Sequence, residues 1–108
     1  MPSAQGVRDL LVPHLMGRLD SSGSTLEVTD LEVIEEGRKF TVVFELTAQG
    51  ERWRVRIPCD SSEMGIFDGN PPYDLIRYTA TMLHIRLFEW WQTKGSERQA
   101  AKQGERID

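Results

Sequence analysis

Cys59 is the one cysteine of this 108-residue chain, and cysteine is a residue type used in nucleophilic catalysis. With a histidine, either His14 or His84, and a carboxylate such as Asp60, it supplies the residue types of a cysteine-based site. Their spacing along the chain does not support such a site, and a lone cysteine at a strand end is more often a small buried hydrophobic residue. We therefore predict that the protein is not an enzyme.

The segment from residue 58 to residue 73 is acidic and contains no lysine or arginine. Its Asp60 and Asp68 offer oxygen ligands that suit calcium or magnesium, but the spacing does not match that of a calcium-binding loop. The run from Asp60 to Glu63 more simply resembles a capping box that opens a helical turn. We predict no bound metal ion and no cofactor.

A pocket between the sheet and this acidic segment is the alternative that the residue types leave open. It would be built around Cys59, Asp60, Asp68, Tyr73 and His84. Such a pocket would make the protein a small ligand-binding or enzymatic domain. A histidine beside the cysteine in a cleft would favour this alternative.

Three arginines, Arg52, Arg54 and Arg56, alternate along one expected strand and therefore share a face of the sheet. They could meet phosphates, but acidic residues such as Glu32 and Glu45 are expected on the neighbouring strands of the same face. That face also lacks aromatic residues for base stacking, and the formal net charge of the chain is -4, so nucleic-acid binding is disfavoured. A surface with both signs of charge suits the steering of a protein partner.

The elements that would position these residues follow from the spacing of the hydrophobic residues. Val7, Leu11 and Leu15 lie four residues apart, which predicts a helix over residues 5–20. Pro13 removes one amide donor and should kink or split that helix. A cluster of turn-forming residues then ends it.

Three strands follow, because the hydrophobic period changes to two. They are expected at about residues 25–35, 40–47 and 52–57. The pair Gln49-Gly50 fits a two-residue hairpin loop, in which glycine supplies a positive φ. That loop would set Glu45 opposite Arg54.

The first strand is expected to join the second through the loop Glu36-Gly37, which would set Val33 opposite Phe40. The first apolar residues of this strand are out of phase with the later ones. A β-bulge near residues 29–30 would bring all of them to one face.

A long helix is expected from just after Asn70, which can cap it, to about Thr93. One apolar stripe should cover the sheet, formed by Leu75, Thr79, Met82, Leu83, Leu87 and Trp90. A second stripe carries His84, Phe88 and Trp91. Either the N-terminal helix packs against this second stripe, or the stripe is a partner-binding surface such as a homodimer interface.

Together these elements predict an α+β fold. We expect a two-layer sandwich of an N-terminal helix, a three-stranded antiparallel meander and a long C-terminal helix in residues 1–95, with a disordered polar tail at 96–108. This order resembles that of double-stranded-RNA-binding domains. The basic residues that this family carries at the start of its second helix are absent, since residues 70–74 are acidic, so the resemblance implies no function for this chain.

The function expected from these features is that of a non-enzymatic protein–protein interaction module, such as an adaptor, a small chaperone or an immunity-type protein. A homodimer is predicted, because a small sheet can hide its outer face or an edge strand against a second copy. No apolar run is long enough for a bilayer and no signal peptide is recognisable, which favours the cytoplasm and no membrane partner. The predicted partner-binding residues are His84, Phe88, Trp91, Arg52, Arg54 and Arg56.

Overall fold

The computed structural model describes residues 4–21, 23–37, 39–59, 65–67, 71–93 and 104–107. Its elements are α1 (Ala4–Leu15), β1 (Gly17–Ser21), β2 (Ser24–Glu36), β3 (Lys39–Ala48), β4 (Glu51–Cys59), α2 (Tyr73–Thr93) and β5 (Gly104–Arg106). The strands form one sheet in the order β1-β2-β3-β4-β5, and every neighbouring pair is antiparallel. The predicted α+β class is confirmed.

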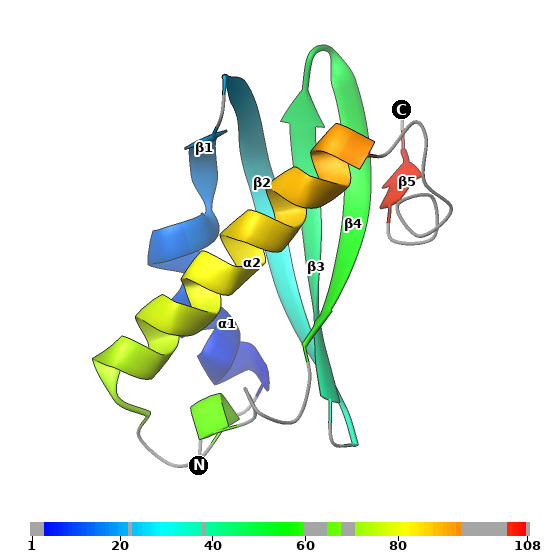
Figure 1. Ribbon diagram of the computed structural model, residues 1–108. Helices are drawn as coiled ribbons and strands as arrows, with labels where there is room; N and C mark the ends of the chain where they lie inside the picture. The colour runs from blue at the N-terminus through cyan, green and yellow to red at the C-terminus, as the bar shows by residue number, and fades with distance from the viewer. Residues whose placement is uncertain are drawn as a thin grey trace.

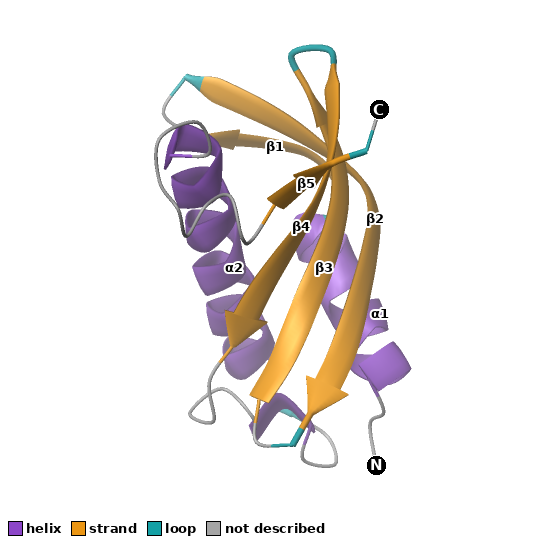
Figure 2. Ribbon diagram, turned by 90° about the vertical axis from the view of Figure 1, so that its right-hand side faces the viewer, coloured by secondary structure: helices purple, strands orange, loops and turns teal. Residues whose placement is uncertain are grey.

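Both helices lie on the same face of the sheet, as Figure 2 shows. α2 crosses the strands diagonally, while α1 packs against β2 and against α2 (Figure 1). Burial alternates along β2 and β4, so the apolar side chains of these strands point toward the helices. The other face, here called the outer face, is covered by no element that the structure describes.

The sheet has five strands, so the predicted three-stranded meander is wrong in number. The first extra strand is β1, in a region that the sequence assigns to the end of a helix. α1 ends at Leu15, and Gly17 then takes a φ of 90° that helical residues do not adopt. Leu19 is buried and lies four residues after Leu15, so its spacing fits a continued helix as well as a strand.

The second extra strand is β5, which lies in the segment that the sequence assigns to a disordered tail. It pairs with β4, with Gly104 opposite Val55 and Arg106 opposite Trp53. A Cβ atom at Gly104 would lie 2.5 Å from the indole ring of Trp90, so glycine permits the close approach of the two segments. The rest of the predicted tail, residues 96–103 and 108, is outside the described residues.

The predicted register of β3 with β4 is confirmed, and Glu45 lies opposite Arg54. Gln49 and Gly50 have φ angles of 51° and 77°, and positive φ at both positions is what a type I′ hairpin turn requires. A two-residue turn of this kind leaves one way to pair the flanking strands, which is why the sequence predicts this register.

The predicted register of β2 with β3 is wrong by two residues. Val33 lies opposite Val42 and not Phe40, because the strands continue to the pair formed by Glu36 and Lys39. A shift of two residues keeps every side chain on its face, so the apolar residues remain buried. The predicted bulge is confirmed, since the register shifts between Val28 and Asp30.

Both apolar stripes of α2 contribute to the hydrophobic core. In the sheet-facing stripe Thr79, Leu83, Leu87 and Trp90 are buried, whereas Leu75 and Met82 are only partly so. The second stripe is also largely buried, at Ala80, Phe88 and Trp91. The rings of Trp90 and Trp53 meet edge to face, with centroids 5.3 Å apart, which ties the end of α2 to β4.

Candidate interaction surfaces

The outer face carries the three arginines of β4, all of which point away from the helices. The registers of β2, β3 and β4 place each arginine in a row of three residues across these strands. The rows are Glu27, Thr47, Arg52; Asp30, Glu45, Arg54; and Glu32, Val43, Arg56. Every row begins with an acid on β2 and ends with an arginine on β4. Across β2, β3 and β4 the outer face therefore has an acidic strand and a basic strand, separated by β3. Beyond these strands, Arg18 of β1 lies beside Glu27 and Glu105 of β5 lies beside Arg54.

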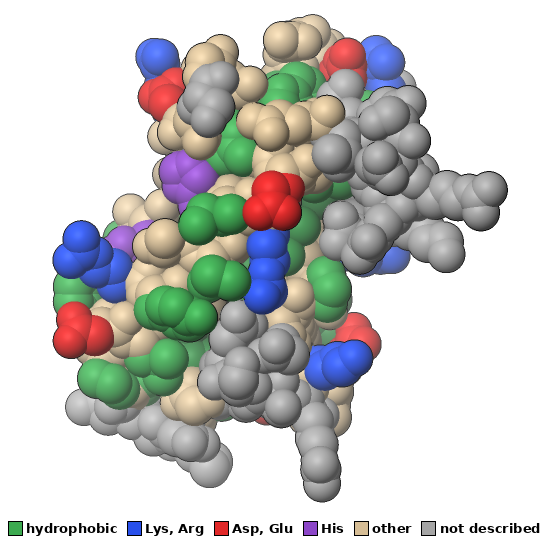
Figure 3. Space-filling model, viewed as in Figure 1, with side chains coloured by type: hydrophobic (Ala, Val, Ile, Leu, Met, Phe, Trp, Pro, Cys, Tyr) green, Lys and Arg blue, Asp and Glu red, His purple; other side chains and the backbone are tan. Residues whose placement is uncertain are grey.

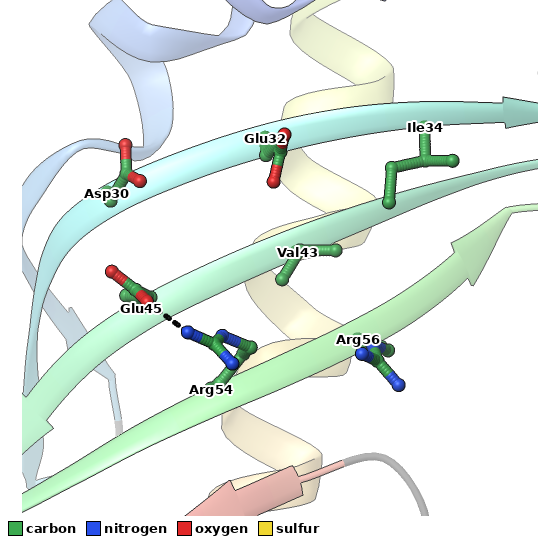
Figure 4. Close-up of a pocket in the computed structure, with 7 residues that line it drawn as sticks. All are labelled: Asp30, Glu32, Ile34, Val43, Glu45, Arg54 and Arg56. Carbon is green, nitrogen blue, oxygen red and sulfur yellow. Dashed lines mark hydrogen bonds and ion pairs between the residues drawn. The ribbon is translucent and has the colours of Figure 1, made fainter. Parts of the chain in front are cut away.

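Glu45 on β3 neutralises one arginine of the basic strand. Its Oε1 atom accepts a hydrogen bond of 2.8 Å from Arg54 Nη2, drawn as the dashed line in Figure 4. This hydrogen bond, and then the charge of Glu45, raise the pKa of Arg54, with smaller contributions from the charges of Glu105 and Glu32. Arg54 is thus the most firmly paired of the three arginines.

The other two arginines, Arg52 and Arg56, are exposed and form no ion pair with any residue in the described ranges. The acids of β2 lie two strands away from β4, at a distance of about 10 Å. Cross-strand neutralisation, which the sequence suggests for all three arginines, therefore holds for Arg54. On the acidic strand β2, Asp30 forms an ion pair with Arg8 of α1, whose Nη2 atom lies 3.6 Å from Asp30 Oδ1.

A groove of about 230 Å³ lies between the acidic and the basic strand. Its lining, labelled in Figure 4, consists of Asp30, Glu32, Ile34, Val43, Glu45, Arg54 and Arg56. Val43 forms its apolar centre and is almost covered, while Ile34 is 39% exposed. An apolar centre with charged residues of both signs around it is the composition of a small protein interface.

The second stripe of α2 does not present an exposed surface. Phe88 is 3% exposed and Trp91 is 8% exposed, and both belong to the hydrophobic core. His84 is half-buried and stacks on Phe88, with ring centroids 4.9 Å apart. Of the two interpretations of this stripe, burial agrees with packing inside one chain. A partner could reach these rings only by displacing core residues.

A different side of α2 is exposed and apolar. Tyr78 is 55% exposed, Ile85 is 48% exposed, and Met82 lies half-buried between them. Their spacing of four and three residues places all three on one narrow stripe, here called the α2 ridge. Figure 3 shows hydrophobic side chains gathered along the course of α2. Neither Tyr78 nor Ile85 is among the residues predicted from the sequence, although their spacing of seven residues is a recognisable signal.

The residues of the alternative pocket are not brought together by the described part of the chain. Cys59 is buried near Arg86, whose Nη1 atom lies 3.9 Å from Sγ and donates a 3.1 Å hydrogen bond to the carbonyl oxygen of Pro58. His84 lies about 200° around the helix from Arg86 and so faces another way. Tyr73 is exposed, and its ring centroid lies 5.9 Å from that of His14.

Asp60 and Asp68, the two acids of the predicted pocket, lie outside the described residues. Among the residues that are described, no three side chains of His, Cys, Asp or Glu gather closely enough to hold a metal ion. Neither α1 nor α2 has the length and apolar character of a membrane-spanning helix.

No protein-family model, curated protein or solved structure matches this chain at a significant level. The outer face and the α2 ridge are therefore the two candidate binding surfaces of the described residues.

Proposed function

We propose that this chain is a non-enzymatic protein–protein interaction module that acts in the cytoplasm and binds its partner with the outer face of the sheet. The observation that carries the proposal is the division of this face into an acidic strand and a basic strand. An adaptor, a small chaperone or an immunity-type protein would use such a surface. Opposite charges held apart on one rigid face favour a partner that presents the reverse arrangement.

The shape of the outer face favours a protein over a small molecule. Its groove of about 230 Å³ is smaller than the pockets of about 300 to 1,000 Å³ that hold small molecules. The charged rows extend along much of β4, from Arg52 to Arg56. Small-molecule sites are concave and bury most of the ligand surface, whereas protein interfaces are broad and have a polar rim. The apolar residues Val43 and Ile34 lie among the charged residues, where an interface core is expected.

The α2 ridge is the weaker candidate surface. Scattered exposed hydrophobic residues are common on soluble proteins, and a short apolar stripe does not specify a partner. The outer face differs in this respect, because the order of acids and arginines sets both the orientation and the register of what can bind.

The proposal is tested by reversing one charge on the outer face and one elsewhere. Arg56→Glu changes the basic strand, and Arg77→Glu makes the same charge change at an exposed position of α2. Proteins captured from a cell extract by the wild type are identified and purified, and the Kd of each, a second copy of this chain included, is measured against all three chains. Arg56→Glu should weaken binding by about 10-fold or more, while Arg77→Glu should change it by less than about 2-fold.

Equal binding by the wild type and Arg56→Glu would contradict the proposal, as would a loss confined to Arg77→Glu. Thermal melts of the three chains check that folding is unchanged. Both substituted side chains are exposed, so the free energy of unfolding should stay within about 0.5 kcal/mol of the wild type.

A further inference from the structure

We propose that the partner of the outer face is a second copy of this chain, related to the first by a two-fold axis that runs along β3. This inference rests on the proposed function, because it uses the same surface. It adds the identity of the partner and the direction of the symmetry axis. Both follow from the order of charges across the sheet.

A two-fold axis that lies between two stacked sheets and parallel to their strands exchanges the left and right sides of the sheet. β2 of one copy then lies over β4 of the other, so the acidic strand faces the basic strand twice. In the row through Val43, Glu32 of each copy faces Arg56 of the other. In the next row Asp30 faces Arg54 in the same way. Stacked sheets lie about 10 Å apart, a distance that glutamate and arginine side chains together can span.

The residues on β3 lie close to this axis and meet their own copies. Val43 would pack against Val43 at the centre. Since Val43 is already almost covered, the exposed Ile34 supplies more of the apolar surface that the contact removes from water. Ile34 and Pro58 share a row on either side of Thr41, so the exposed Ile34 of one copy would lie over Pro58 of the other. Glu45 also approaches its copy, but its carboxylate is already held by Arg54 of its own chain.

The charge order excludes the other in-plane axis, perpendicular to the strands. That axis would place β2 over β2 and β4 over β4, so that Glu32 faces Glu32 and Arg56 faces Arg56. Like charges in direct opposition are destabilising. The acidic and basic strands therefore select one of the two axes.

The size of the face indicates a weak dimer. Three strands at about 4.8 Å and about ten residues at about 3.3 Å span about 480 Å² per copy, or about 950 Å² in total. This lies below the range of standard stable interfaces and within that of transient ones. We therefore expect a Kd on the order of micromolar that rises with salt concentration, since exposed charge pairs are screened.

The test uses Glu32→Lys and Arg56→Glu, singly, mixed as two chains, and combined in one chain. In a homodimer of either single variant, like charges oppose each other at both copies of the contact, and the Kd should rise by about 10-fold or more. In an equimolar mixture of the two single variants, every contact is again between opposite charges. The chain with both changes also restores contacts between opposite charges, because the introduced lysine of one copy then faces the introduced glutamate of the other. The mixture and the combined chain should return to within about 3-fold of the wild-type Kd.

Sedimentation equilibrium measures these constants, at low salt and at about 0.5 M salt. Arg77→Glu is the matched control and should dimerise like the wild type. A wild type that stays monomeric at about 1 mM while its mixture of variants associates would indicate the perpendicular axis and overturn the inference.

Failure of the inference can be told from failure of the proposed function. In one outcome the wild-type chain is monomeric and yet binds a different protein, with a Kd that Arg56→Glu raises. This result overturns the second copy as the partner and leaves the outer face as a binding surface. A dimer that is insensitive to both charge reversals uses another face and overturns the inference. The proposed function is overturned as well only if Arg56→Glu also binds every captured protein with the Kd of the wild type.

Discussion

Asp20 on β1 lies in an electrostatic environment that lowers the pKa of its carboxyl group. Its Oδ1 atom accepts a 2.6 Å hydrogen bond from the hydroxyl of Thr25, which lies opposite it on β2. This bond is the largest cause of a lowered pKa of Asp20. The hydrogen bond and charge of Arg18 act in the same direction, and desolvation acts against them.

Thr25→Val should therefore raise the pKa of Asp20 toward its ordinary value, which an NMR titration of the carboxyl group measures. A carboxyl group with a lowered pKa in the folded state adds stability above its ordinary pKa, and this stability is lost as the pH falls through the lowered value. In Thr25→Val this pH dependence should shrink. A pKa of Asp20 that does not move would show that the hydroxyl is not its cause.

Gly104 leaves no room for a side chain, because an added methyl group would meet the ring of Trp90 at 2.5 Å. Gly104→Ala should lower the free energy of unfolding by about 1 to 3 kcal/mol, the usual cost of overpacking. Gly104 does not have a positive φ, so the substitution changes the contact and leaves the backbone conformation accessible.

Chemical denaturation followed by tryptophan fluorescence measures this loss. Glu105→Ala, an exposed neighbour, is the control and should stay within about 0.5 kcal/mol. A melt of Gly104→Ala that superimposes on the wild type would show that β5 does not hold its place against Trp90.

Helix α1 supplies a hydrogen-bond donor to the open edge of β2. The pairing of β1 with β2 ends at Val28, so the second half of β2 has no strand on that side in the described part of the sheet. Arg8 of α1 donates a 2.7 Å hydrogen bond from Nε to the carbonyl oxygen of Leu31 and lies 3.6 Å from Asp30. A charged side chain on an open edge satisfies backbone groups and hinders pairing with other chains.

Arg8→Ala should cost about 1 to 2 kcal/mol of stability, because a partly buried, charge-assisted hydrogen bond is lost. The matched control is Arg18→Ala, whose exposed ion pair with Asp20 should contribute less than about 1 kcal/mol. Urea denaturation of both variants gives the comparison. An equal loss in the two would show that the bond to the β2 edge adds nothing beyond an exposed ion pair.

The strongest sequence signals were those of long elements with a regular period. β3 and β4 were predictable in position and register, because their apolar residues alternate and the turn at Gln49 and Gly50 admits one pairing. β1 was not, because it is short and its one buried residue, Leu19, also fits a helical spacing. β5 was not, because the feature that lets it dock is the missing side chain of Gly104, which leaves no hydrophobic signal.

The candidate site residues also differ in how far the sequence predicts their position. The shared face of Arg52, Arg54 and Arg56 follows from parity within one strand, and the register of β4 places all three on it. Whether Phe88 and Trp91 are core or surface depends on how helices pack, which periodicity within α2 does not determine.

One face of the sheet is closed by the two helices, and the other carries the charges of the three rows across β2, β3 and β4. The helix-covered side accounts for the stability of the fold, because nearly all fully buried side chains lie there. The outer face contributes little to that core, and its charge order is self-complementary. One side of the sheet is therefore the structural layer, and the other is the surface for which we propose a binding role.

Pairing of the outer face with a second copy is measured by amide NMR spectra recorded over a dilution series of the wild-type chain. We predict concentration-dependent shifts at Glu32, Val43 and Arg56, weakened at high salt, with Tyr78 and Ile85 of the α2 ridge unchanged. Shifts confined to the ridge, with the three rows of the outer face unaffected, would contradict this pairing.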